Sequence, residues 1–84
     1  MGTYGNDIQA AIAAQIKAEM GAKGWKQADL AKATSMQGST LYRYLAGARD
    51  IPLPVMADIA TALGMDIIEL AQRAQRRLDG KDVS

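Results

Sequence analysis

The stretch from residue 27 to residue 46 constrains the fold more than any other part of the sequence. It contains two short segments with apolar residues at the spacing of an amphipathic helix, and only a tight turn fits between them. The residues expected on the buried sides are Leu30, Ala31, Leu41, Tyr44 and Leu45, with Met36 as an apolar plug before the second segment. Ala31 favours a closely crossed pair, because two helices that cross steeply after a short turn need a small side chain at their contact.

The outward side of the second segment carries small groups, hydrogen-bonding groups and one bidentate donor. Its residues are Gln37, Gly38, Ser39, Thr40, Tyr42, Arg43 and Ala46. Such a face suits the DNA major groove, which admits an α-helix and presents donors and acceptors on base edges. Arg43 lies one turn after Ser39, and its guanidinium can donate hydrogen bonds to both O6 and N7 of one guanine. Arg43 could instead clamp a phosphate, and base contact is the interpretation favoured here.

Residues 27 to 64 resemble the helix-turn-helix of the phage repressor/Cro family, often called Xre-like. The residues that carry the resemblance are Gln27, Leu30, Ala31, Met36, Leu41, Tyr44, Gly47, Ala62, Leu63 and Gly64. Three positions depart from the family pattern. Lys26 stands where a Ser or Thr cap is usual, Ser35 where the turn often has Gly, and Gly38 where a base-reading side chain is frequent. The resemblance implies an all-α, five-helix, lambda-repressor-like DNA-binding domain.

The outward face and the resemblance together predict two sets of DNA contacts. The residues expected to read bases are Gln37, Ser39, Thr40 and Arg43. The residues expected to contact the DNA backbone are Lys26, Gln27, Gly38, Tyr42 and Arg49. Family members commonly bond a phosphate at the position of Gln27, whose alternative role is that of an exposed residue at a helix start. Tyr42 could touch a phosphate or a thymine methyl group.

The N-terminal part of the sequence predicts a helix capped by Asn6 or Asp7, with residues 1–5 frayed. Gly21 or Gly24 ends this helix, and Gly24 is the favoured left-handed residue. Its expected core stripe is Ile8, Ala11, Ile12, Ile16 and Met20. Trp25 is expected to pack the start of the next helix against the core. Stacking on nucleic acid is the less favoured role for Trp25, since single-strand binders usually offer several aromatic side chains.

The C-terminal part predicts two more helices. Pro54 suits the first turn of the fourth helix, which ends at Gly64. The apolar face expected for this helix comprises Val55, Met56, Ile59, Ala60 and Leu63. Asp66 can cap a fifth helix over about residues 66–78, whose stripe is Ile67, Leu70, Ala71, Ala74 and Leu78, followed by a polar tail. This helix looks longer than the core requires. The overhang beside Arg73, Arg76 and Arg77 could serve a dimer contact, a phosphate contact or a lead into another domain, or end in solvent.

Charge is distributed unevenly along the 84 residues, although the net charge is only +1. Residues 23–49 hold five basic residues against Asp29 alone, a balance of +4 that coincides with the proposed motif. Residues 50–72 hold four acidic residues and no basic one, a balance of −4. Attraction of DNA phosphates would require such a positive block, although chance clustering on a solvated face gives the same pattern.

Composition narrows the function further. A chain of 84 residues is expected to form one domain, residues 1–84, with a thin helical core, because it has no Phe and a single Trp. It has no Cys and no His, which removes disulfides, thiolate chemistry, the commonest metal ligand and the usual proton shuttle at neutral pH. Catalytic residues, metals, cofactors and small-molecule ligands are therefore not expected. No apolar run suggests a membrane span or signal peptide, so a location in the bacterial cytoplasm, at the nucleoid, is expected.

The function predicted from these features is that of a sequence-specific regulator of transcription that binds double-stranded operator DNA. A phage or prophage repressor is the favoured form, with a homodimer through the C-terminal helix as one arrangement. An antitoxin-like protein that binds a toxin and represses its own promoter is the alternative. An enzyme is poorly supported, since the acidic residues are scattered over separate helices, and a purely structural interaction domain remains open.

Overall fold

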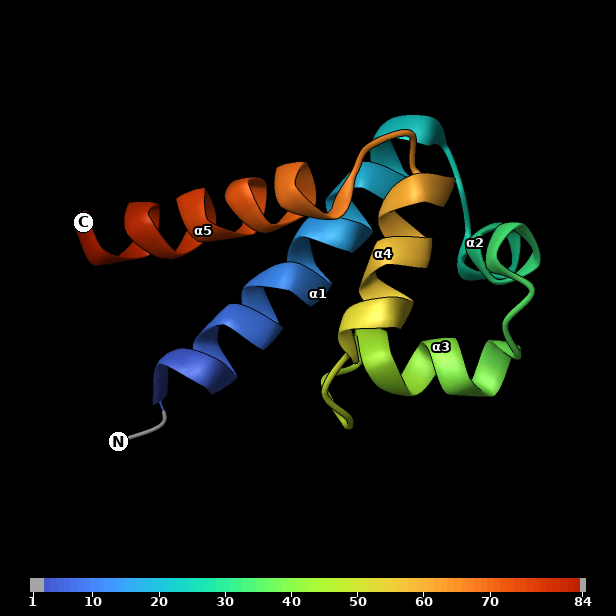
Figure 1. The fold of residues 1–84 in the computed structure, drawn as a ribbon, viewed down its shortest axis with the longest axis horizontal. Coiled ribbons are helices and arrows are strands. Elements are labelled where there is room, and N and C mark those ends of the chain that lie inside the picture. The colour runs from blue at the N-terminus through green and yellow to red at the C-terminus, as the bar shows by residue number, and fades with distance from the viewer. Residues whose placement is uncertain (1–2, 84) are drawn as a thin grey trace.

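The computed structural model describes residues 3–83, and this part of the chain forms five α-helices joined by short connections, with no strand (Figure 1). The helices are α1 (Thr3–Lys23), α2 (Gln27–Thr34), α3 (Gly38–Leu45), α4 (Leu53–Ala62) and α5 (Ile67–Val83). The two longest helices, α1 and α5, pack along one another, and α2, α3 and α4 gather at one end of α1. The predicted all-α, five-helix fold is confirmed.

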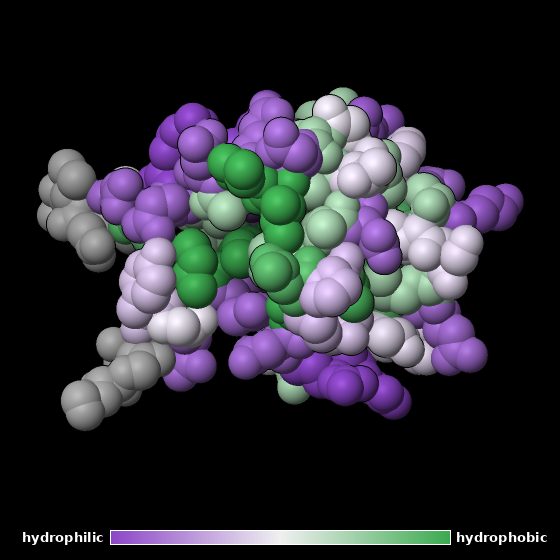
Figure 2. All heavy atoms as spheres, in the orientation of Figure 1, coloured by the Kyte–Doolittle hydropathy of each residue, from purple (hydrophilic) through white to green (hydrophobic). Residues whose placement is uncertain are grey.

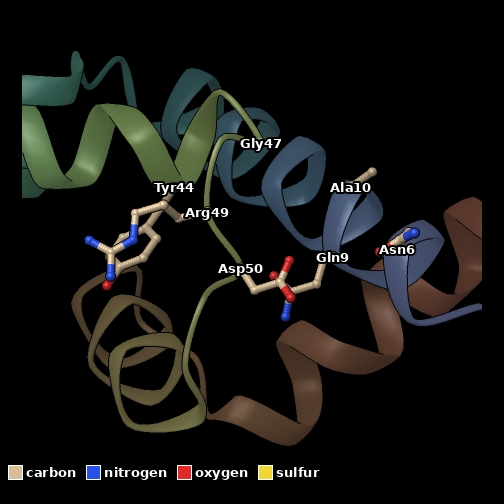
Figure 3. A pocket seen from close by; sticks show the side chains of 7 residues that line it. All are labelled: Asn6, Gln9, Ala10, Tyr44, Gly47, Arg49 and Asp50. Atoms are coloured by element: carbon tan, nitrogen blue, oxygen red, sulfur yellow. The ribbon is translucent and has the colours of Figure 1, made fainter. Parts of the chain in front are cut away.

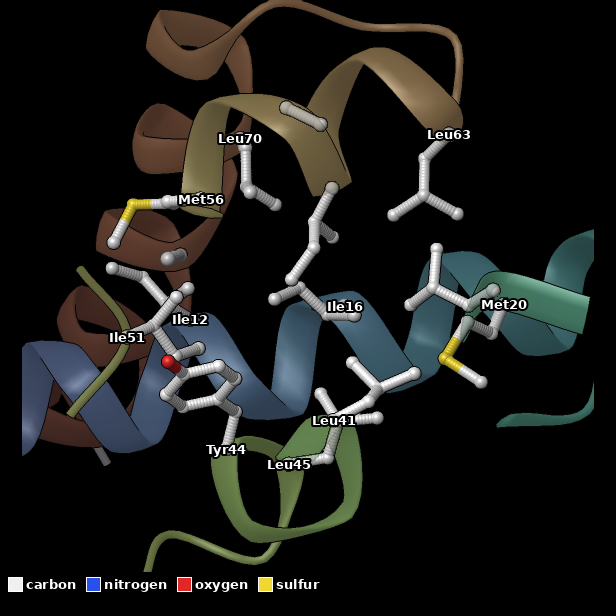
Figure 4. Close-up of a cluster of buried hydrophobic side chains, with 14 of the residues drawn as sticks. Ile12, Ile16, Met20, Leu41, Tyr44, Leu45, Ile51, Met56, Leu63 and Leu70 are labelled. Carbon is white, nitrogen blue, oxygen red and sulfur yellow. The ribbon is translucent and has the colours of Figure 1, made fainter. Parts of the chain in front are cut away.

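Each helix contributes one large aliphatic side chain that is fully removed from solvent. These are Ile16, Leu30, Leu41, Ile59 and Leu70, all 0% exposed, and they belong to a single cluster (Figure 4). The cluster contains Ile, Leu, Met and Ala side chains together with Tyr44, whose burial the helical spacing predicts. Met36 and Trp25 pack against it as partly buried side chains, which confirms both of their predicted structural roles. Burial of one stripe from each helix fixes how the five helices sit against one another.

The predicted helix stops are confirmed at Gly24, Gly47 and Gly64, where φ is +71°, +80° and +85°. Ser35 adopts the same left-handed conformation after α2, with φ 57° and ψ 34°, although it has a Cβ atom. The Met36 N–H donates to the Ala31 carbonyl at 2.9 Å, which closes the end of α2 and directs the chain into the turn. The turn between α2 and α3 therefore has the left-handed geometry for which related sequences often use glycine.

We expect Ser35→Gly to raise the free energy of unfolding by about 0.5–1 kcal/mol. The left-handed region costs a residue with a Cβ atom roughly 1 kcal/mol or more, and this strain outweighs the added backbone freedom of glycine in the unfolded chain. Ser39→Gly is the matched control, because Ser39 lies inside helix α3, where glycine destabilises. Urea unfolding of both variants measures the difference, and equal losses would contradict the assigned strain.

Two predicted boundaries are wrong, the start of the first helix and the end of the last one. Helix α1 begins at Thr3, so Asn6 and Asp7 lie inside the helix and do not cap it, and residues 3–5 are helical rather than frayed. Helix α5 continues to Val83, beyond the predicted end at residue 78, and replaces most of the predicted polar tail. The first turn of α1 is bonded to α5, since the Tyr4 hydroxyl donates to Oε1 of Gln75 at 2.6 Å. Residues 1, 2 and 84 lie outside the described range.

Helix α5 is not an overhang over most of its length. Ala74 is fully buried and Leu78 packs against the core, so the predicted stripe faces α1. Asp66 caps the helix as predicted, its Oδ1 accepting the Glu69 N–H at 2.8 Å. The Glu69 carboxylate accepts a hydrogen bond from Arg73, which also donates to Oε2 of Glu19 on α1 at 2.5 Å. Arg73 thus ties the two long helices together.

We expect the Arg73 link to make stability depend on pH. The Arg73 guanidinium holds the pKa of Glu19 below its ordinary value of 4.5, although partial burial opposes this shift. A depressed folded-state pKa means that the unfolded chain takes up a proton first as the pH falls. The stabilisation is therefore complete above about pH 4.5 and is lost as the pH drops through the folded-state pKa of Glu19.

Arg73→Met keeps the aliphatic stem and removes the charge, and it should lower the urea midpoint at neutral pH. The effect should be small, because the Arg73 side chain is 34% exposed. The difference from the unmodified protein should shrink as Glu19 takes up its proton, because the Arg73–Glu19 pair then loses its charge. Arg76→Met, an exposed position on the same helix, should change neither the midpoint nor its pH dependence. A difference for Arg73→Met that persists in acid would show that packing, not charge, is lost.

Candidate nucleic-acid interface

Helices α2 and α3 form the predicted helix-turn-helix. Leu30 and Ala31 are the buried residues of α2, and the short turn through Ser35 leads directly into α3. In Figure 1, α3 lies along the lower edge of the molecule, with α2 at its N-terminal end and the α3–α4 loop at its C-terminal end. Helix α5 crosses the upper part of the same view. The helix predicted to read DNA is therefore at an edge that α5 does not cover.

The inner and outer sides of α3 are divided as the sequence predicts. Its buried residues are Leu41, Tyr44 and Leu45. Gln37, in extended conformation just before the helix, is exposed, as are Ser39 and Arg43, while Thr40 is half-buried. Ser39 and Arg43 are four residues apart, so they lie one above the other on the outward face. Three of the four residues predicted to read bases, Gln37, Ser39 and Arg43, are thus left exposed by the protein, and Thr40 is only partly accessible.

Two further predicted contacts lie on α3. Tyr42 is 60% exposed, so its ring and hydroxyl are available to a partner. Gly38 is the first residue of the helix, and a Cβ atom built there would meet nothing within 4 Å. Open space of this kind around an N-terminal turn would let a DNA backbone approach the helix closely.

Lys26 and Gln27 lie exposed at the start of α2. Asp29 orders this helix start, since its Oδ2 accepts the Lys26 backbone N–H at 2.8 Å. The first N–H groups of any helix have no partner within the helix. These free N–H groups and the positive end of the helix dipole both favour binding of an anion there. A phosphate at this end would meet these N–H groups and the side chains of Lys26 and Gln27.

Arg49 lies exposed in the α3–α4 loop, with its guanidinium carbon 5.8 Å from the centroid of the Tyr44 ring. A pocket of about 180 Å³ opens beside it, between the loop and the first half of α1 (Figure 3). Gln9 lines this pocket and has no role predicted from the sequence, and its side chain is hydrogen-bonded to the loop backbone at Ile51. The signal that could have found Gln9 is a polar residue next to the core stripe of α1, but nothing in the sequence names its partner.

The structure thus brings the predicted site residues to three neighbouring elements, the start of α2, the outward side of α3 and the loop after it. A family model described as a helix-turn-helix domain matches residues 11–79. The chain belongs to this helix-turn-helix family. The match covers all of α2, α3 and α4, and it therefore includes every residue predicted to contact DNA.

The solved structures include a similar regulator. The crystal structure of the clp gene regulator ClgR from C. glutamicum superposes with a TM-score of 0.75, at 20% sequence identity, over 83% of this chain and 91% of that one. At this level of identity the likeness establishes the fold. No curated protein sequence matches the helix-turn-helix chain.

In the described residues of the helix-turn-helix protein, side-chain chemistry and helix length bear on two other kinds of site, a metal site and a membrane span. No group of three or more His, Cys, Asp or Glu side chains there is arranged to hold a metal ion. None of the described helices is both long and apolar enough to cross a membrane.

Proposed function

We propose that this helix-turn-helix protein is a sequence-specific regulator of transcription that binds double-stranded operator DNA, with residues 1–84 acting as one DNA-binding domain. The observation that carries the proposal is the outward side of α3, where Ser39 and Arg43 are exposed while Leu41 and Tyr44 hold the helix to the core. A helix anchored on one side and lined with hydrogen-bonding groups on the other fits the major groove.

The proposed contacts are of two kinds, base contacts that give specificity and phosphate contacts that fix the register on the duplex. Base reading falls to Gln37, Ser39, Thr40 and Arg43, which the structure leaves at the surface of α3 or just before it. Register on the duplex is set by phosphate contacts, because such contacts orient a protein without carrying sequence information. The residues proposed for these are Lys26, Gln27, Gly38, Tyr42 and Arg49.

The proposed mechanism is repression, in which the protein occupies an operator and blocks polymerase. We propose the phage or prophage repressor as the form of this regulator, acting at the bacterial nucleoid without catalysis, cofactor or small-molecule ligand. The resemblance of residues 27 to 64 to the phage repressor/Cro helix-turn-helix supports this form. An antitoxin-like protein is the competing form, and co-purification of a small toxin protein would favour it.

A homodimer through α5 is the proposed arrangement on a palindromic operator. Ile68 in the first turn of α5 is 64% exposed, so its apolar side chain is available to a partner. Figure 2 shows hydrophobic residues gathered in the middle of the face that α1, α4 and α5 form in Figure 1. A second copy could cover this apolar strip and space two recognition helices along the DNA.

The test of the proposed function is selection of bound duplexes from a random pool. A consensus sequence supports specific recognition, and a palindrome with two half-sites supports the dimer. A single half-site points to monomeric binding. Recovery of unselected DNA, or of none, contradicts the proposal.

A further inference from the structure

The loop between α3 and α4 is held by a side chain from the other end of the sequence, Gln9 of α1. The Gln9 carboxamide oxygen accepts the backbone N–H of Ile51 at 2.7 Å, and its Nε2 donates to the Ile51 carbonyl at 3.3 Å. One side chain thus pairs with both backbone groups of one loop residue. The Ile51 side chain is only 2% exposed, so the loop is fixed at this residue by packing as well.

Arg49 stands two residues before this fixed point. Its guanidinium lies near the ring of Tyr44 at a cation–π distance, and Tyr44 is 7% exposed on the inner side of α3. Figure 3 shows Arg49 beside Tyr44 and the Gln9 side chain directed toward the loop. A guanidinium held against a ring keeps donors free at its edge, where a phosphate could accept them.

We propose that Gln9 is a positioning residue for DNA binding, because it holds the α3–α4 loop so that Arg49 meets a phosphate. This inference rests on the proposed function, in which Arg49 contacts the DNA backbone. Without the two hydrogen bonds from Gln9, the loop would lose its polar anchor to α1. Arg49 would then be less ordered before binding, since only Ile51 packing and the Tyr44 ring would still hold it, and the conformational freedom lost on binding would weaken the complex.

The variant Gln9→Leu tests this role, because it removes both hydrogen bonds and nearly keeps the side-chain size. Gln15→Leu is the matched control on the same helix. The Gln15 carboxamide is also hydrogen-bonded, to Glu19 and Arg77, but it lies away from the α3–α4 loop. Both variants are first compared by thermal unfolding, and binding is measured at a temperature where both are folded.

Binding is measured over a series of salt concentrations on two duplexes, one carrying the selected consensus and one with the same bases scrambled. Gln9→Leu should weaken binding to both duplexes by the same factor, about threefold to tenfold, because one charge-assisted contact is weakened and not removed outright. The slope of log affinity against log salt should become shallower by up to about 0.9, the value for one phosphate. Gln9→Leu should cause no further loss in an Arg49→Ala background, and Gln15→Leu should leave affinity and slope unchanged.

Other outcomes overturn the inference at distinguishable levels. A normal salt slope for Gln9→Leu, or a full further loss in the Arg49→Ala background, would make Gln9 a structural residue only. Normal binding by Arg49→Ala would show that Arg49 makes no phosphate contact, so that Gln9 has nothing to position. DNA recognition through α3 would not be contradicted by this result. If the unmodified protein prefers neither duplex, the proposed function fails and the positioning role fails with it.

Discussion

Leu41→Ala is expected to lower the free energy of unfolding by about 2.7–5 kcal/mol, the range measured for leucine-to-alanine changes in well-packed cores. Leu41 is 0% exposed, and Figure 4 shows it directed from α3 toward α1. Removing its branched end leaves a cavity where α3 is attached to the rest of the protein. The loss is large because a chain of 84 residues has a total stability of only roughly 4–12 kcal/mol.

This effect also reaches the candidate interface. Helix α3 has 8 residues, and a helix so short does not form alone in water, so its position depends on the buried side chains Leu41 and Leu45. The melting temperature of Leu41→Ala should fall by roughly 10 °C or more. Thermal and urea unfolding followed by circular dichroism measure both quantities.

Tyr42→Ala is the matched control one position along. Tyr42 is 60% exposed, so its removal should change the free energy of unfolding by no more than about 0.5 kcal/mol. The same variant should weaken DNA binding, because Tyr42 is a proposed backbone contact. If Tyr42→Ala destabilises the protein as much as Leu41→Ala does, the inward and outward sides of α3 have been assigned incorrectly.

The division between these two sides could be predicted from the sequence because helical periodicity is a local property. The spacing of Leu41, Tyr44 and Leu45 fixes one buried side whatever the partner helices are, and it leaves Ser39 and Arg43 outside. The stops at glycine were predictable for the same reason, since a left-handed residue closes a helix through hydrogen bonds to its own last turn.

What could not be predicted depends on partners distant in sequence. The extensions of α1 and α5 are supported by contacts between Tyr4 and Gln75 and by Leu78 on the core, which local capping signals do not contain. Gln9 is 42 residues from Ile51, and a glutamine on a helix carries no sign of its partner. The left-handed Ser35 shows the same limit, because the tertiary packing of the turn overrides the preference of the residue itself.

Arg43→Ala is expected to cost about 1–3 kcal/mol of discrimination at one base pair of the operator, the usual worth of a bidentate contact to guanine. Arg43 is exposed on the outward side of α3, one turn after Ser39, so it is placed for the groove rather than for the core. Affinity for the consensus should fall by roughly fivefold to 150-fold, and affinity for a duplex changed at that base pair should fall far less.

Arg49→Ala is the comparison that separates base reading from phosphate contact. It should weaken binding to every sequence by a similar factor and make the salt dependence shallower by about one phosphate. Equal losses on all sequences for Arg43→Ala would identify Arg43 as a phosphate clamp and move base reading to Gln37, Ser39 and Thr40. Arg43→Lys sharpens the test, because lysine keeps the charge but lacks the planar fork, so discrimination should fall while the salt dependence is retained.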